Sequence, residues 1–245
     1  MISLDRLKKH IEDLPNELLN QVIAIYLYGS AARGDTDNQS DVDLFFAIQD
    51  CSDDYYVSFK RNLTSYFNCN EVEVSIYQQK MIFEMFTKGS YFLWHLKQEG
   101  VQLYKSSTWM SNLLNTLPVY KGTFDDFREY RQVLGDIEES ISLDLSTVNY
   151  ELSTLAILIR NTCIGLCYIN GVKSFSRRSP IIWCLETYSG KIPFTIEEFD
   201  VLYYYRIAQT RGHDIEGCTD LGYVYTWIKN TKALLDLAIS IREAL

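Results

Sequence analysis

The chain has 245 residues, a net charge of −9 and 47% hydrophobic residues. This length suffices for two modest domains or one large one, and the composition is that of a globular protein rather than a disordered one. The acidic balance, with no basic cluster longer than Arg177-Arg178, argues against a large nucleic-acid footprint and leaves room only for a local basic pocket.

The N-terminal segment lacks the apolar core of a signal peptide, and no run approaches the roughly 20 apolar residues of a membrane span. We therefore expect a cytoplasmic protein that is not inserted in a membrane. The six cysteines show no Cys-x-x-Cys spacing and no paired histidines, which favours reduced thiols over a zinc site.

The first part of the chain alternates helical and strand patterns. Helical spacing covers residues 3–22, 53–68 and 78–97, and strand patterns cover 23–28, 42–48, 70–77 and 100–104. Pro15 interrupts or restarts the first helix, and Gly89 divides the third helical stretch into two short helices. The helix over 53–68 is expected to be a crossover between two strands.

The second part of the chain is helical throughout. The pattern loosens over residues 106–123, around Pro118 and Gly122, which predicts a domain boundary. Five helices are expected beyond it, over 124–145, 147–170, 176–188, 195–211 and 221–245. Thr195 and Glu198 form a capping-box pattern at the start of the fourth helix.

Residues 23–48 carry the side chains best suited to phosphate chemistry. Gly29 follows a strand directly, so the backbone can approach a phosphate, and Ser30 adds a hydroxyl and an amide donor where a helix turn would begin. Asp41 and Asp43 stand two apart in a strand-like run, so both carboxylates leave one face, roughly 6 to 7 Å apart along the strand. Such a pair suits hard cations, although two acids can also merely keep a strand end soluble.

Three segments together resemble the signature of the DNA polymerase β-like nucleotidyltransferase superfamily, in the form of its minimal and kanamycin-nucleotidyltransferase-like members. They are Gly29-Ser30, Ala32-Arg33-Gly34 and Ser40-Asp41-Val42-Asp43-Leu44. The resemblance implies an α+β protein: a mixed-sheet nucleotidyltransferase domain over residues 1–110, followed by an all-α helical bundle over 120–245. A weaker similarity links 160–163 and 171–177 to the HEPN-like helical domains fused to many bacterial nucleotidyltransferases.

The same resemblance implies a third carboxylate on the strand that follows the crossover helix. Glu73 matches it, because it lies between apolar residues inside that strand. Glu71 shares the face of Glu73 and remains the alternative.

The family resemblance implies Mg²⁺-dependent transfer of a nucleoside monophosphate, with AMP from ATP as the expected case, onto a hydroxyl. Asp41 and Asp43 would hold two Mg²⁺ ions, and Glu73 would complete the second site. Gly29 and Ser30 would bind the β- and γ-phosphates. Arg33 would add positive charge near the leaving pyrophosphate.

The helical half offers further candidates. Lys173 and Arg177, with Arg160, are expected to hold the triphosphate, although all three could equally be ordinary solvated cations. His95 has the surroundings of a packed histidine rather than a catalytic one. The sequence does not choose a general base among Glu138, Glu139, Asp144 and Glu151.

The sequence leaves several candidates for the acceptor of the nucleoside monophosphate. A helical domain beside the nucleotidyl domain, in an acidic protein, favours a small hydroxylated compound such as an aminoglycoside-like antibiotic. Alternatives are a toxin–antitoxin enzyme that AMPylates a protein and an inactive nucleotide-binding module. A ribonuclease using Arg206 and His213 is disfavoured by Ile207 and Gly212. A homodimer is left open.

Overall fold

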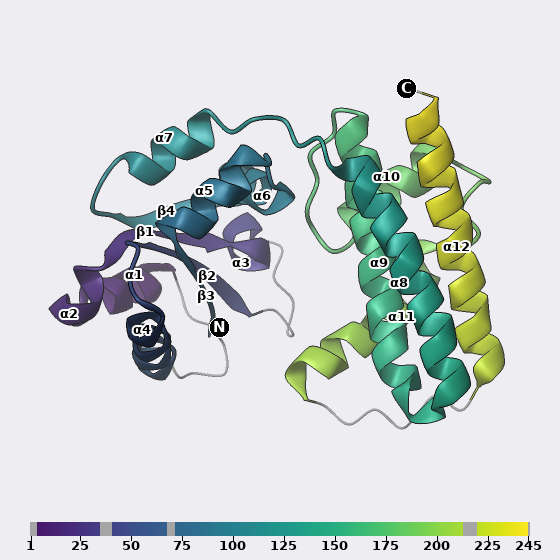
Figure 1. The fold of residues 1–245 in the computed structure, drawn as a ribbon, viewed down its shortest axis with the longest axis horizontal. Helices are drawn as coiled ribbons and strands as arrows, with labels where there is room; N and C mark the ends of the chain where they lie inside the picture. The colour runs from purple at the N-terminus through teal and green to yellow at the C-terminus, as the bar shows by residue number, and fades with distance from the viewer. Residues whose placement is uncertain (1–3, 35–40, 68–71, 213–219, 245) are drawn as a thin grey trace. The chain divides into compact units, whose positions relative to one another are not determined.

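The computed structural model describes residues 4–34, 41–67, 72–212 and 220–244. The chain divides into two compact units, Met1–Lys121 and Gly122–Leu245. The first combines a sheet with helices and the second is helical (Figure 1). This confirms the predicted α+β class.

The first unit contains a four-stranded sheet in the order β3-β2-β1-β4. Its strands are β1 (Val22–Tyr28), β2 (Val42–Ile48), β3 (Val72–Gln78) and β4 (Val101–Lys105). β1 is antiparallel to β2 and β4, while β3 is parallel to β2. The sheet is therefore mixed, as predicted. Helix α4 (Asp53–Tyr66) supplies the crossover that a parallel pair requires.

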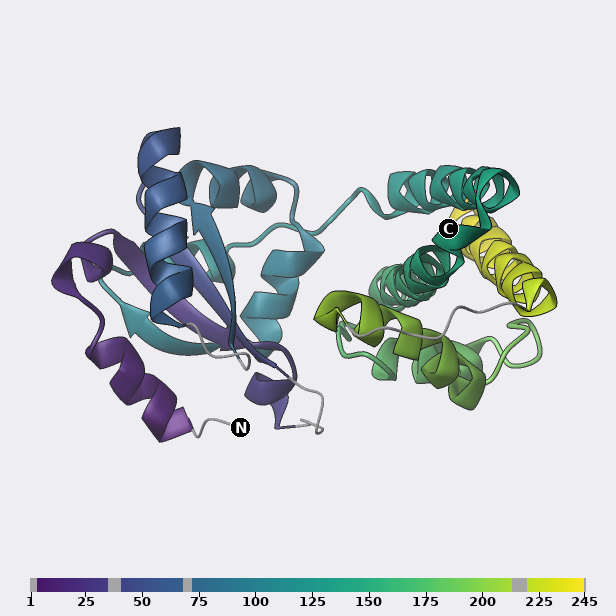
Figure 2. The same ribbon diagram turned by 90° about the horizontal axis from the view of Figure 1, so that it is seen from below.

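One face of the sheet is covered by α1 (Leu4–Glu12) and α4, which lie below the strands in Figure 1 and in front of them in Figure 2. Leu7 of α1 and Leu63 of α4 pack with Ile25, Leu44 and Phe46 in one buried cluster. The alternation of β2 places Leu44 and Phe46 on this face, so hydrophobic burial fixes the register of the strand. The short α2 (Asn16–Leu19) follows α1 in the chain and begins directly after Pro15.

The opposite face of the sheet is aromatic. It is covered by α6 (Tyr91–Glu99), together with α5 (Gln79–Thr87), which follows β3 directly. The ring of Phe45 on β2 lies 5.6 Å from Tyr77 and 5.7 Å from Phe92 of α6. Gly89, with a φ of 67°, separates the two helices at the predicted position.

A further helix, α7 (Trp109–Asn115), lies in the stretch that the sequence pattern left irregular. Met110, Leu113 and Leu114 are its buried residues, and their spacing of three and four is helical. The pattern was missed because only two turns of helix lie between polar residues. The first unit therefore continues past this helix to Lys121.

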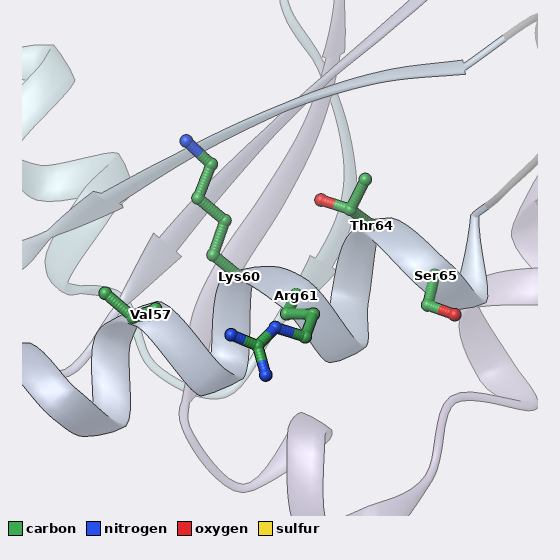
Figure 3. A pocket seen from close by; sticks show the side chains of 5 residues that line it. All are labelled: Val57, Lys60, Arg61, Thr64 and Ser65. Carbon is green, nitrogen blue, oxygen red and sulfur yellow. The ribbon is translucent and has the colours of Figure 1, made fainter.

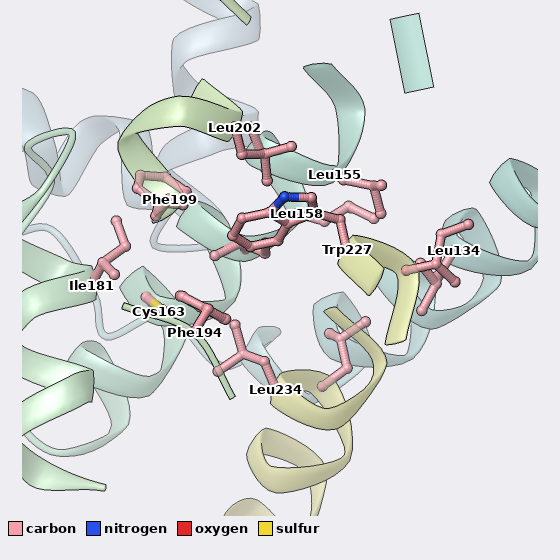
Figure 4. Close-up of a cluster of buried hydrophobic side chains, with 14 of the residues drawn as sticks. Leu134, Leu155, Leu158, Cys163, Ile181, Phe194, Phe199, Leu202, Trp227 and Leu234 are labelled. Carbon is pink, nitrogen blue, oxygen red and sulfur yellow. The ribbon is translucent and has the colours of Figure 1, made fainter. Parts of the chain in front are cut away.

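The second unit is a bundle of five helices built around its second one. These are α8 (Thr123–Leu143), α9 (Val148–Ile169), α10 (Ser179–Thr187), α11 (Ile196–Arg211) and α12 (Leu221–Glu243), with a single 3-10 turn, η1 (Leu145–Thr147), before α9. α9 packs against each of the other four helices. Figure 4 shows Leu155 of α9 in the shared core with Phe199 and Trp227. Thr195 and Glu198 form the predicted capping box.

The position of α9 explains why it is so apolar. The segment Leu145–Ile169 is long and apolar enough to cross a membrane by length and composition, which the sequence analysis did not expect. In the bundle, however, 67% of an 18-residue apolar window of that segment is buried. A helix surrounded by other helices needs apolar side chains on all sides, so the bundle core accounts for this composition.

The cysteines that the structure describes carry free thiols, as predicted. Cys163, Cys167 and Cys184 are buried at the contact of α9 and α10, and Cys51 is partly exposed. Cys69 and Cys218 lie outside the described residues.

Candidate active site

The acids named from the sequence meet at one edge of the sheet. Asp43 on β2 is paired with Tyr28 on β1 and with Glu73 on β3. Because β2 and β3 are parallel and in register, Asp43 and Glu73 leave the same face of strands that lie roughly 4.8 Å apart. Asp41 precedes β2 directly and is half-buried. Glu71 and Ser40 lie outside the described residues, so the choice between Glu71 and Glu73 is not tested.

Asp43 is held in an environment that disfavours its negative charge. Burial raises the pKa of this carboxyl to about 7, with further contributions from the charges of Glu73 and Asp41, while Arg33 acts in the opposite direction. The influence of both acids on one carboxyl shows that the three groups form one electrostatic cluster. Burial is the largest cause of the raised pKa, and the neighbouring acids add to it.

Gly29 makes room for this carboxylate. It begins the short helix α3 (Gly29–Arg33) and has a φ of 72°. A Cβ atom added there would lie 2.1 Å from Oδ2 of Asp43. The glycine is therefore required by Asp43 as well as by its backbone conformation, a reason that the sequence analysis did not foresee. Its proposed contact with phosphate stays a prediction.

Arg33, the last residue of α3, is fixed by an acid from α6. Its Nη1 donates to Oε2 of Glu99 at 2.6 Å, and the side chains of Arg33 and Glu99 are 21% and 15% exposed. The same Oε2 lies 3.0 Å from Nε2 of His95. Burial alone would raise the pKa of Glu99, but the hydrogen bonds from His95 and Arg33 hold it below its usual value. Glu99 is therefore charged at neutral pH.

Tyr28 is a site residue that the sequence analysis missed. Its hydroxyl lies 3.2 Å from Oγ of Ser75. Burial, followed by the charges of Asp43 and Glu73, raises its pKa to about 12, so the phenol stays neutral. The available signal was its place directly before Gly29, at the end of an apolar strand. The ring of His95 packs edge-on against Tyr28 at 5.7 Å, in agreement with the expected packed histidine.

Of the basic residues predicted to hold the triphosphate, Lys173 and Arg177 follow α9 and Arg160 lies on α9 itself. Arg160 donates to the backbone oxygens of Phe175 and Ser176 and so holds this segment in place. The guanidinium of Arg177 lies over the ring of Tyr203, 5.1 Å from its centre, and Lys173 is half-buried. Their predicted contact with a triphosphate is not tested by these contacts.

The candidate general bases differ in surroundings. Glu138 and Glu139 are exposed on α8, whereas Glu151 on α9 is buried. Asp144 accepts a hydrogen bond from the backbone N–H of Ser146 and caps the 3-10 turn before α9, which gives it a structural task. None of the four is selected by these contacts. Of the disfavoured ribonuclease pair, Arg206 lies on α11 and His213 lies outside the described residues.

The acidic cluster fits a magnesium ion that is completed by its substrate. Carboxylate oxygens are the ligands that Mg²⁺ prefers, and the excess of negative charge around Asp43 would be relieved by a cation. Within the described ranges, no three His, Cys, Asp or Glu side chains are arranged to hold a metal ion by themselves. Mg²⁺ commonly uses one or two carboxylates plus waters and substrate phosphates, so a ready-made protein cage is not required.

A shallow depression of about 500 Å³ lies elsewhere on the first unit (Figure 3). Its lining residues are Val57, Lys60, Arg61, Thr64 and Ser65, all on the exposed face of α4. Because α4 covers the face of the sheet opposite to Asp43, this depression is not part of the acidic site.

Residues 9–108 match the family model described as Polymerase beta, Nucleotidyltransferase. The chain therefore carries a nucleotidyltransferase domain of the polymerase β type, which confirms the resemblance stated from its motifs. No curated protein matches the sequence.

Several solved structures are similar to the chain, among them the following two. One is the spectinomycin adenyltransferase AAD(9) from Enterococcus faecialis, solved with ATP and spectinomycin, at 16% identity and a TM-score of 0.53, over 96% of this chain and 100% of that one. This likeness supports the fold of both units. The other is a toxin-antitoxin structure with AMP-PNP, at 16% identity and a TM-score of 0.31, over 55% of this chain and 95% of that one.

Proposed function

We propose that this nucleotidyltransferase is Mg²⁺-dependent and moves AMP from ATP onto a hydroxyl group of a small molecule. The observation that carries the proposal is the placement of Asp43 opposite Glu73 on paired strands, with Asp41 directly before β2. Acids placed on one face beside a strand-to-helix turn suit phosphoryl transfer, which depends on positioning and on compensation of charge.

Asp41 and Asp43 would hold Mg²⁺ together with the substrate phosphates, and Glu73 would complete a second site. When bound, Mg²⁺ supplies positive charge to the phosphates and lowers the pKa of an acceptor hydroxyl. The chain itself keeps these acids in place: Gly29 leaves room for the carboxylate of Asp43, and β2 and β3 align it with Glu73. Tyr28 closes the other side of Asp43 with a neutral phenol that adds no charge.

The nucleotide would be bound through its phosphates. Gly29 and Ser30 offer backbone and hydroxyl donors at the turn after β1, and Arg33 offers a guanidinium whose charge already acts on Asp43. Lys173 and Arg177 would add countercharge from the second unit. ATP is favoured as the donor because AAD(9), which shares the fold, is an adenyltransferase solved with ATP.

The acceptor we propose is a small, hydroxylated and cationic compound of the aminoglycoside kind. Two observations favour it: the chain has a net charge of −9, and the fold of both units is shared with an enzyme solved with spectinomycin. A cationic acceptor would be attracted to such a protein and would not compete with the anionic nucleotide for the same contacts.

The test is to incubate the protein with Mg²⁺, ATP labelled in its α-phosphate and a panel of aminoglycosides and aminocyclitols. Mass spectrometry should then find an acceptor with one added AMP. Label on the protein itself or on a protein partner would instead show AMPylation of protein. Absence of all transfer, with ATP binding retained, would show an inactive binding module. Asp43→Asn is the control that removes enzymatic transfer while leaving the chain otherwise intact.

A further inference from the structure

We infer that Glu99 is a positioning residue that holds Arg33 beside the acidic cluster, so that the guanidinium meets the triphosphate in a fixed orientation. This inference rests on the proposed function, because it requires Arg33 to contact phosphate. It concerns a residue that the motif analysis did not single out and that stands 66 positions from Arg33 in the chain.

Arg33 needs such support because its own helix gives it little. α3 has five residues, and Gly34 follows Arg33 at once in the left-handed conformation. An arginine side chain loses much rotamer freedom when it is fixed, so without Glu99 the ligand itself would have to order Arg33. If Arg33 is already fixed in the folded protein, its rotamer entropy is lost during folding and not when the ligand binds.

Glu99 is well placed to provide this fixation. It is the last residue of α6, and its Oε2 accepts from Nη1 of Arg33 at 2.6 Å and from Nε2 of His95 at 3.0 Å. The three side chains are 14% to 21% exposed, so the contact is largely shielded from water. Shielding makes a charge-assisted hydrogen bond stronger and more directional than a surface ion pair.

His95 in turn connects Glu99 to the site. Its ring lies edge-on against Tyr28, and the Tyr28 hydroxyl reaches Ser75 on β3, two residues after Glu73. A continuous set of contacts therefore runs from Arg33 through Glu99, His95 and Tyr28 to the strand that carries Glu73. Arg33 donates to Glu99 through Nη1, and its charge also acts on Asp43, so the guanidinium lies beside the acidic cluster.

A double-mutant cycle tests the inference by calorimetry of Mg²⁺-ATP and of AMP. Glu99→Ala should weaken ATP binding about five- to tenfold and AMP binding less than twofold, because only the phosphate tail reaches Arg33. In an Arg33→Ala background, Glu99→Ala should weaken ATP binding little further, because its effect on ATP is exerted through that side chain. Glu99→Gln, which keeps the size and one acceptor, should fall between wild type and Glu99→Ala.

Controls separate this inference from the proposed function. Asp236→Ala removes an arginine–carboxylate pair on the second unit, Arg131–Asp236, and should leave ATP binding unchanged. The role of Glu99 would be refuted if Glu99→Ala weakened the binding of ATP and AMP equally. It would also be refuted if Glu99→Ala weakened ATP binding as much in the Arg33→Ala background as in wild type. Neither result would bear on the proposed function. Wild-type protein that binds no Mg²⁺-ATP would overturn the proposed function. If Glu99→Ala does not fold, Glu99→Gln decides the same comparison.

Discussion

The two faces of the sheet are built from the same strands but do different work. On β2, Leu44 and Phe46 point to the face covered by α1 and α4 and are fully buried in the apolar core. Asp43, one position away, points to the other face, where the acids collect. A period of two therefore lets one strand serve stability and chemistry at adjacent positions. This separation of roles would be refuted if a substitution on one face changed both transfer activity and stability.

The largest expected effect is on transfer. Asp41→Asn and Asp43→Asn should each lower the rate of nucleotidyl transfer by about a thousandfold or more, since a metal ion supplies several kcal/mol of charge stabilisation. The fold should survive, because neither carboxylate belongs to the apolar core. Transfer assays with Mg²⁺ and thermal melting of the same samples would check this. Activity that persists in both variants would refute the mechanism.

Leu44→Ala, one residue further along β2, should lower stability and leave transfer activity largely unchanged. Leu44 is 0% exposed among large apolar neighbours, so its truncation should lower the free energy of unfolding by about 2 to 5 kcal/mol. Urea unfolding measures this loss. At a temperature where the variant is still folded, its transfer rate should stay within a few-fold of wild type. A stable but inactive Leu44→Ala protein would show that the two faces are not independent.

The acidic face should also make stability depend on pH. The pKa of Asp43 is raised from 3.8 to about 7, so the folded protein binds a proton more tightly than the unfolded one, and stability falls as pH rises between these values. Asp43→Asn removes this loss and should be more stable than wild type at pH 8 by on the order of 2 to 4 kcal/mol, but not at pH 4. Urea unfolding at both pH values measures the difference.

Two comparisons sharpen that measurement. Asp136→Asn, at an exposed position on α8, should change stability little at either pH. Mg²⁺ should raise the stability of wild type at pH 8 more than that of Asp43→Asn, because binding to the folded state stabilises it by mass action. A wild-type protein whose stability does not fall between pH 5 and pH 8 would show that Asp43 is solvated and that its charge is compensated.

The sequence predicted what local patterns determine. The alternation around Asp43, the glycine after the first strand and the capping box at Thr195 each need only a few neighbouring residues, and the structure shows all three in place. Contacts between segments far apart in the chain leave no local pattern in the sequence, so they were not predicted. The pairing of Arg33 with Glu99 and the neighbourhood of Tyr28 with both acids join segments far apart in the chain. The buried helix α9 was underestimated for a related reason, since its apolar character follows from its central place in the bundle.

The smallest expected effect concerns the basic segment of the second unit. Lys173→Ala combined with Arg177→Ala should raise the dissociation constant for Mg²⁺-ATP by roughly tenfold, if both cations make charge-assisted contacts worth about 1 to 2 kcal/mol together. Arg178→Ala is a matched control, because this neighbouring arginine is exposed and pairs with Asp200. Calorimetry of the double variant and the control gives the comparison. If the double variant binds ATP as wild type does, Lys173 and Arg177 are solvated surface charges, and the phosphate contacts come from the first unit alone.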